Sequence, residues 1–302
     1  MKKFLIQVFL YLLIIVLLDM ATGFVMSYMV DHAQGGDTNR HNYICSQSKD
    51  DILIFGSSRA LRHYNSILIG DSLGMSCHNC GESGNGIIYN YGQYQMIKQR
   101  YTPKILIYEF YPPYDYLKGD NQKYLRWLKP YYDRQGISEI FNSVDNREKY
   151  KMTSNLYKYN SLIFNIIPDF IHPMKSSGIK GFVPLASKGR SVQVNKNVMK
   201  LEYMGEEDKL KLYYLKKLIM ESKGSKLIFV MSPTWYGVDE RGLVSIKRIC
   251  QEENIPFIDF SNDTLFVHNN TYFKDGNHLN EDGANMFSKQ LVEKIKPIVF
   301  CN

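Results

Sequence analysis

Cysteine is scarce in this sequence, and no long run of one charge occurs. Only five cysteines are present in 302 residues. Cys77 and Cys80 resemble half of a zinc or redox site, but no second Cys/His pair follows at zinc spacing. We therefore expect these two cysteines to pack in the core, and we expect neither a metal nor another cofactor. Because the lysines are spread among tyrosines and acids, the net charge of +7 predicts a solvated surface without nucleic-acid binding.

The N-terminal stretch is the longest apolar segment. Two lysines precede a run from Phe4 to Leu18 that is apolar apart from one glutamine, and after Asp19 the sequence continues mostly apolar to Val30. A bilayer-spanning helix needs about 20 residues. The lysines favour a cytoplasmic N-terminus and an extracytoplasmic remainder. A cleaved signal peptide is the alternative, but no convincing small-x-small cleavage site follows Leu18, so we expect an uncleaved anchor over residues 1–30.

A short apolar run from Ile52 to Phe55 ends in a glycine and two serines. The run is typical of a strand buried on both faces, and a helical pattern begins near Ser58. A strand that turns sharply into a helix brings one side chain and free backbone N–H groups to the carboxyl edge of a sheet. Ser58 can therefore be a nucleophile. It can also be an ordinary helix N-cap, which this stretch alone favours.

Asp275 and His278 lie three residues apart, just before the last predicted helix. At that spacing one turn can present a histidine and a carboxylate that orients it. A serine needs such a partner, because its hydroxyl is a weak nucleophile without an adjacent base. Taken singly, the pair fits a polar loop before a helix. Combined with Ser58, it predicts a Ser-His-Asp site.

Three stretches resemble the sequence blocks of the SGNH (GDSL-like) hydrolase superfamily. Residues 56–58 resemble the first block, with Ser58 at the nucleophile position. Residues 79–86 resemble the second, with Gly84 at the oxyanion-hole glycine, and residues 275–278 resemble the last, which supplies the aspartate and the histidine. The resemblance implies a three-layer α/β/α fold with a parallel, flavodoxin-like sheet, and serine esterase or acyl-transfer activity.

The third block departs from the family pattern. A Gly-x-Asn-Asp segment is expected after a strand, but residues 105–110 lead into Tyr111 and two prolines, without an asparagine. Since prolines lack an N–H group, Tyr111 is the nearest side-chain donor. We expect the N–H groups of Ser58 and Gly84 to converge on one point, with Tyr111 in the place of the asparagine. A Gly-Ser-Ser first block without this asparagine resembles the divergent membrane-anchored branch of the superfamily. That branch includes the D-alanyl-transfer and alginate-acetylation factors.

Apolar runs alternate with helical patterns along the rest of the chain. The predicted strands cover residues 52–55, 75–79, 105–110, 227–231 and 257–260. The predicted helices cover residues 87–100, 206–222 and 239–253, and a last helix is capped by Asn280 and ended by Pro297. This alternation predicts a parallel sheet with helices on both faces, and ligands in such folds bind at the carboxyl ends of the strands.

The remaining segments set the predicted domain organisation. Residues 31–50 are polar and read as a linker, which leaves residues 51–302 as the α/β domain. Residues 111–204 fit the alternation poorly and read as an insertion at the edge of the predicted site. Such an insertion can be a lid, an acceptor-binding surface or a structural cover, and the sequence leaves these open.

Two functions fit the sequence. The first is an extracytoplasmic serine esterase or O-acyltransferase that acts on acyl esters of a cell-surface polysaccharide or other acylated glycan. For this function the family resemblance implies a polytopic membrane O-acyltransferase as partner. The second is a catalytically inactive SGNH-fold binding or scaffolding protein of a polysaccharide-modification complex. The missing asparagine supports the second function, whereas intact Ser58, Asp275 and His278 favour the first.

Overall fold

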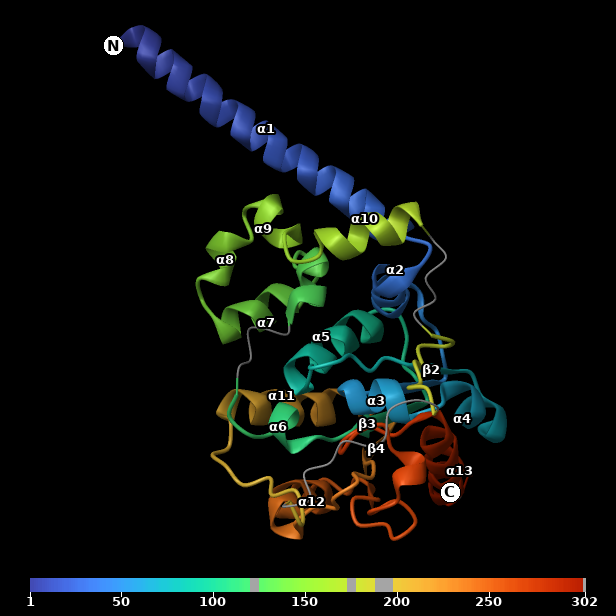
Figure 1. The fold of residues 1–302 in the computed structure, drawn as a ribbon. Coiled ribbons are helices and arrows are strands. Elements are labelled where there is room, and N and C mark those ends of the chain that lie inside the picture. The colour runs from blue at the N-terminus through green and yellow to red at the C-terminus, as the bar shows by residue number, and fades with distance from the viewer. Residues whose placement is uncertain (120–124, 173–177, 188–197, 301–302) are drawn as a thin grey trace. The chain divides into compact units, whose positions relative to one another are not determined.

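The computed structural model describes residues 1–119, 125–172, 178–187 and 198–300 (Figure 1). Cys301, one of the five cysteines, lies outside this range. The chain divides into a helical unit, formed by Met1–Gln47 and Leu125–Ser176, and an α/β unit, formed by Ser48–Tyr124 and Ser177–Asn302.

The α/β unit is built on a parallel sheet that has, among the described residues, five strands in the order β2-β1-β3-β4-β5. The strands are β1 (Ile52–Phe55), β2 (Cys77–Asn79), β3 (Ile105–Glu109), β4 (Lys226–Met231) and β5 (Phe257–Asp259). The order is the flavodoxin-like one, as predicted from the sequence. The strands are largely buried, which is why they read as continuous apolar runs rather than as alternating patterns.

Helices cover both faces of this sheet (Figure 1), which confirms the predicted fold class. On one face, alternate strand residues such as Ile54 and Ile107 share a core with α3 (Ser58–His63), α4 (Ser66–Leu73) and α13 (Glu281–Phe300). On the other face, the Tyr108 hydroxyl of β3 accepts a hydrogen bond from Asn90 (3.2 Å) on α5 (Ile87–Lys98). The remaining elements of the unit are α6 (Pro112–Asp115), α11 (Lys209–Glu221), η3 (Glu240–Leu243), α12 (Val244–Glu252) and η4 (Asn270–Tyr272).

The last helix begins as predicted and ends later than predicted. The Asn280 side chain caps α13 by accepting a hydrogen bond from the N–H of Gly283 (2.9 Å). The helix passes Pro297 and reaches Phe300. A proline removes the single backbone hydrogen bond to the carbonyl four residues earlier. Within the last turn that loss does not stop the helix.

The helical unit begins with one long helix. The helices are α1 (Lys2–His32), α2 (Gly36–Asn42), η1 (Tyr43–Gln47), η2 (Leu125–Tyr131), α7 (Ile137–Val144), α8 (Glu148–Lys151), α9 (Asn155–Tyr159) and α10 (Ile163–Ile171). α1 is long and apolar enough to span a membrane. We expected it to be exposed all round to about residue 27. It is exposed up to Leu18, but Gly23, Met26 and Val30 are buried where α1 packs on α9 and α10.

Two expected segment boundaries differ from the structure. Residues 31–50 are not an extended linker, because they contain α2 and η1 with His41, Ile44 and Cys45 fully buried. Thr38 shows why polar composition misled: its backbone N–H (2.9 Å) and hydroxyl (2.7 Å) both donate to the buried Asp169 carboxylate of α10. Residues 111–204 do not form one insertion either, since 125–176 belong to the helical unit together with the N-terminal segment.

Candidate active site

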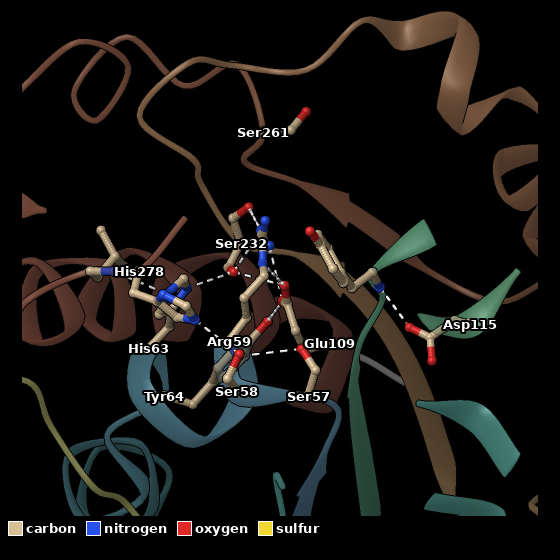
Figure 2. Close-up of polar contacts among 12 residues, drawn as sticks. Ser57, Ser58, Arg59, His63, Tyr64, Glu109, Asp115, Ser232, Ser261 and His278 are labelled. Atoms are coloured by element: carbon tan, nitrogen blue, oxygen red, sulfur yellow. Dashed lines mark hydrogen bonds and ion pairs between the residues drawn. The ribbon is translucent and has the colours of Figure 1, made fainter. Parts of the chain in front are cut away.

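Ser58, His278 and Asp275 come together at the carboxyl edge of the sheet. Ser58 is the first residue of α3, directly after β1, and the other two lie in the loop between β5 and α13. The Ser58 hydroxyl is 2.9 Å from Nε2 of His278 (Figure 2), and Nδ1 of His278 is 3.0 Å from each Asp275 carboxylate oxygen. Ser58 and His278, which are 220 positions apart in the chain, thus form with Asp275 the hydrogen-bonded series that general-base activation of a serine requires.

The neighbouring serine, Ser57, takes the role of helix cap. Its hydroxyl accepts a hydrogen bond from the backbone N–H of Arg59 (3.3 Å), so the Ser58 hydroxyl stays available for His278. Gly56 makes the sharp turn possible. Its φ is +143°, and a Cβ there would lie 2.8 Å from the backbone oxygen of Glu109. Each residue of the Gly-Ser-Ser sequence therefore has its own role: Gly56 forms the turn, Ser57 caps α3 and Ser58 contacts His278.

Asp275 fixes the orientation and tautomer of His278. One of its oxygens also accepts the backbone N–H groups of Asn277 (2.8 Å) and His278 (2.9 Å). Partial burial alone would raise the pKa of Asp275, but the hydrogen bonds from His278 and from these N–H groups hold that pKa below its usual range. The ionised carboxylate only accepts, so Nδ1 of His278 donates to it, which leaves Nε2 as the nitrogen that faces the Ser58 hydroxyl.

The predicted oxyanion-hole residues lie in the same α/β unit. Ser58 is the first residue of α3, so its N–H has no partner within the helix. Gly84 has φ of 75°, a conformation that glycine adopts without strain. Tyr111 follows β3, and its ring lies against the guanidinium of Arg59, whose Cζ is 5.3 Å from the ring centroid. Its backbone N–H donates to Asp115 (2.6 Å), whose pKa is raised by burial to about 7.

A buried ion pair joins Arg59, the residue after Ser58, to Glu109 of β3 (Figure 2). Nε of Arg59 donates to Glu109 (2.8 Å), and both side chains are almost completely buried. The other Glu109 oxygen accepts the Tyr64 hydroxyl and the backbone N–H of Ser232 (3.0 Å). Burial opposes the charge of Arg59, but the Glu109 carboxylate raises the pKa of the guanidinium above its ordinary value. The carboxyl ends of β1, β3 and β4 are therefore joined through one carboxylate.

His63 links this network to the loop that carries His278. Nε2 of the fully buried His63 accepts the backbone N–H of Leu279 (3.0 Å), the residue after His278. Its Nδ1 is 2.8 Å from the Ser232 hydroxyl, which donates to Glu109 (2.8 Å). Burial and the charge of Arg59 lower the pKa of His63 well below its usual value, so its ring is neutral at neutral pH. His63 thus positions the loop that carries His278.

Sequence reasoning missed this network, although one signal was present. Glu109 is the single acidic residue in the otherwise apolar run of β3. A carboxylate in a strand buried on both faces requires donors, because a buried charge without partners is costly. That signal predicts a buried cation nearby, but it does not identify Arg59, which follows a different strand.

Metal ligation gives no competing explanation for the site. No group of three or more His, Cys, Asp or Glu side chains within the described ranges could hold a metal ion. The four cysteines in these ranges are buried, and burial raises the pKa of Cys250 to about 12. Cys77 begins β2 and Cys80 follows its last residue, and both are buried.

No protein-family model matches this chain, and no curated protein matches it significantly.

Proposed function

We propose that this protein is an extracytoplasmic serine esterase or O-acyltransferase, with Ser58 as the nucleophile. The observation that carries the proposal is the contact of 2.9 Å between the Ser58 hydroxyl and Nε2 of His278, with Asp275 on the other imidazole nitrogen. The two lysines before the apolar stretch of α1 support a cytoplasmic N-terminus and a domain outside. The proposed substrates are acyl esters of a cell-surface polysaccharide or other acylated glycan.

The proposed reaction has two acyl-transfer steps. Ser58 Oγ forms a bond to the carbonyl carbon of the donor, and its proton passes to Nε2 of His278. The tetrahedral intermediate collapses, the donor C–O bond breaks, and the leaving alkoxide takes the proton from His278. A glycan hydroxyl, or water in the hydrolytic case, then loses its proton to His278 and attacks the acyl-Ser58 ester. The bond between the acyl carbon and Ser58 Oγ breaks, and Ser58 takes the proton back from His278. Asp275 stays ionised and stabilises the imidazolium in both steps.

Covalent labelling with a fluorophosphonate probe tests the nucleophile. We expect labelling of the full chain in detergent, no labelling of Ser58→Ala, and labelling at least about 10³-fold slower for His278→Ala, because the general base is lost. The rates are measured by gel fluorescence, and circular dichroism checks that each variant is folded.

The neighbouring serine offers a matched control. Ser57→Ala removes the cap of α3, which costs about 1 kcal/mol of stability, but it leaves the contact between Ser58 and His278 in place. We expect Ser57→Ala to label at nearly the parent rate. Absence of labelling in well-folded parent protein would reject the enzyme and leave the inactive scaffolding function. Labelling of Ser58→Ala at the parent rate would show that another residue is the nucleophile.

Tyr111→Phe tests the third oxyanion donor. This change removes only the hydroxyl and keeps the ring against Arg59, so the fold should be preserved. If the hydroxyl stabilises the oxyanion, kcat for hydrolysis of a p-nitrophenyl ester should fall by about 10²-fold with little change in KM. An unchanged kcat would assign oxyanion stabilisation to the backbone N–H groups of Ser58 and Gly84 alone.

A further inference from the structure

The freely exposed part of α1 is shorter than the hydrocarbon core of a bilayer. From Phe4 to Leu18 every side chain is exposed, and this segment rises roughly 22 Å at the α-helical rise. The hydrocarbon core is about 30 Å thick and requires about 20 residues. Lys2 and Lys3 set the other boundary, because their charges stay among the headgroups. A span that begins at Phe4 therefore extends to about Gly23, and any tilt lengthens it further.

At that depth α1 is already packed against α9. The Asp19 carboxylate accepts the backbone N–H groups of Asn155 (2.8 Å) and Leu156 (2.9 Å), the Ser154 hydroxyl (2.8 Å) and the Asn155 amide (3.1 Å). Gly23 allows this close approach, since a Cβ there would lie 2.4 Å from Cγ of Asn155. The acidic group that interrupts the apolar stretch thus has all these partners within the protein, as a charge near hydrocarbon requires.

The outer surface at this level is apolar. Three apolar residues of α1 at helical spacing are exposed, and three apolar residues of α9 and α10, which pack on α1, are exposed as well. We name this set the apolar shoulder: Met20, Phe24, Tyr28, Leu156, Phe164 and Ile171. Phe164 is 91% exposed and Phe24 is 77% exposed. The Tyr28 ring contacts the Phe170 ring of α10 edge to face (6.1 Å between centroids), which joins the two helices.

We propose that the helical unit is partly sunk in the bilayer, with the apolar shoulder as its lipid-contacting surface. In this arrangement α9 and α10 lie in the interface beside the spanning helix, in the manner of interfacial amphipathic helices. The occupant is lipid because Met20, Phe24 and Tyr28 continue the exposed apolar surface of α1 beyond Leu18. The one charged residue between Phe4 and Val30, Asp19, is bonded to α9. The inference depends on α1 crossing the membrane and is independent of the chemistry at Ser58.

Tryptophan fluorescence in vesicles tests the proposal. The full chain with Phe164→Trp is reconstituted in phosphatidylcholine vesicles, with and without lipids brominated near the top of the acyl chains. The parent protein, with its two native tryptophans, gives the baseline. Phe9→Trp reports insertion of α1, and Tyr213→Trp, on an exposed position of α11, is the solvent reference. We expect the added emission of Phe164→Trp and Phe9→Trp to be quenched by bromine, and that of Tyr213→Trp to be unaffected.

Each other outcome overturns the proposal. Quenching at Phe9→Trp but not at Phe164→Trp would place the shoulder in water. A blue-shifted Phe164→Trp emission without quenching would mean that a second copy or another protein covers it. Lack of quenching at Phe9→Trp would remove the spanning helix on which the inference depends. Equal quenching at Tyr213→Trp would indicate nonspecific adsorption. Ile171→Trp provides a second reporter on the same helix, in case Phe164→Trp disturbs packing.

Discussion

Asp275→Asn should slow acylation of Ser58 by about 10⁴-fold, because an amide favours the wrong tautomer of His278. The asparagine oxygen can still accept the N–H groups of Asn277 and His278, so the loop should keep its shape. Its NH₂ group, however, would face Nδ1, which must then accept. Nε2 would carry the proton and could no longer take one from Ser58. Stopped-flow or gel measurement of fluorophosphonate labelling gives the rate.

Two controls separate this electronic effect from simple loss of structure. The unfolding midpoint of Asp275→Asn should stay close to that of the parent, since the hydrogen bonds from the backbone are retained. Asn277→Ala changes the neighbouring side chain but keeps its backbone N–H, and it should label at nearly the parent rate. A loss of less than about tenfold in Asp275→Asn would show that the carboxylate has no catalytic role of this kind.

Glu109→Gln should reduce the free energy of unfolding by about 3–5 kcal/mol, because it leaves the charge of Arg59 buried without its counter-ion. The glutamine has nearly the same size, so the change tests charge rather than volume. Both side chains are almost fully buried, and water cannot replace the lost carboxylate. Urea denaturation followed by circular dichroism measures the difference, provided that the full chain is kept in one detergent throughout.

A double-mutant cycle identifies the ion pair as the cause. Arg59→Met with Glu109→Gln lacks both charges of this pair, so it should be more stable than Glu109→Gln alone. Lys104→Ala serves as the matched control, because its contact with Asp51 (2.9 Å) joins a lysine side chain that is 68% exposed. Removing this pair should cost less than about 1 kcal/mol. Strictly additive effects of Arg59→Met and Glu109→Gln would argue against coupling between the two side chains.

The strands were predictable because their burial leaves a direct signal. β1 matches its apolar run residue for residue, and the other strands differ by one or two residues at an end. The segments that mislead are polar ones whose partners are distant in sequence. Thr38 and Asp169 lie 131 positions apart, and nothing local to residues 31–50 indicates that such a partner will bury them. Pro297 misled for a different reason, because a helix end tolerates a proline that its interior does not.

The candidate site divides in the same way. Ser58, Asp275 and His278 stood out because their residue types and order suit one reaction, and the structure brings them together. The residues that support this site, by contrast, could not be recognised from their sequence context. Arg59 and His63 lie in a helix where basic residues usually face solvent, yet both are buried. Their roles depend on Glu109, at the end of β3, and on Ser232, directly after β4. The sequence around Arg59 and His63 does not indicate that these residues will be in contact with them.

The position of α13 has a consequence for the order in which the chain matures. This helix is synthesised long after α3 and α4, and it holds the turn that precedes α4 through Asn285, which accepts from the Asn65 amide (2.7 Å), and through Ser288, which accepts the Asn65 N–H (2.9 Å). His278 arrives with the same C-terminal segment, 220 residues after Ser58. In a nascent or truncated chain that lacks this segment, Ser58 is present without its histidine partner. The contact between the Ser58 hydroxyl and His278 can therefore form only after this segment has been synthesised and α13 has packed against α3 and α4.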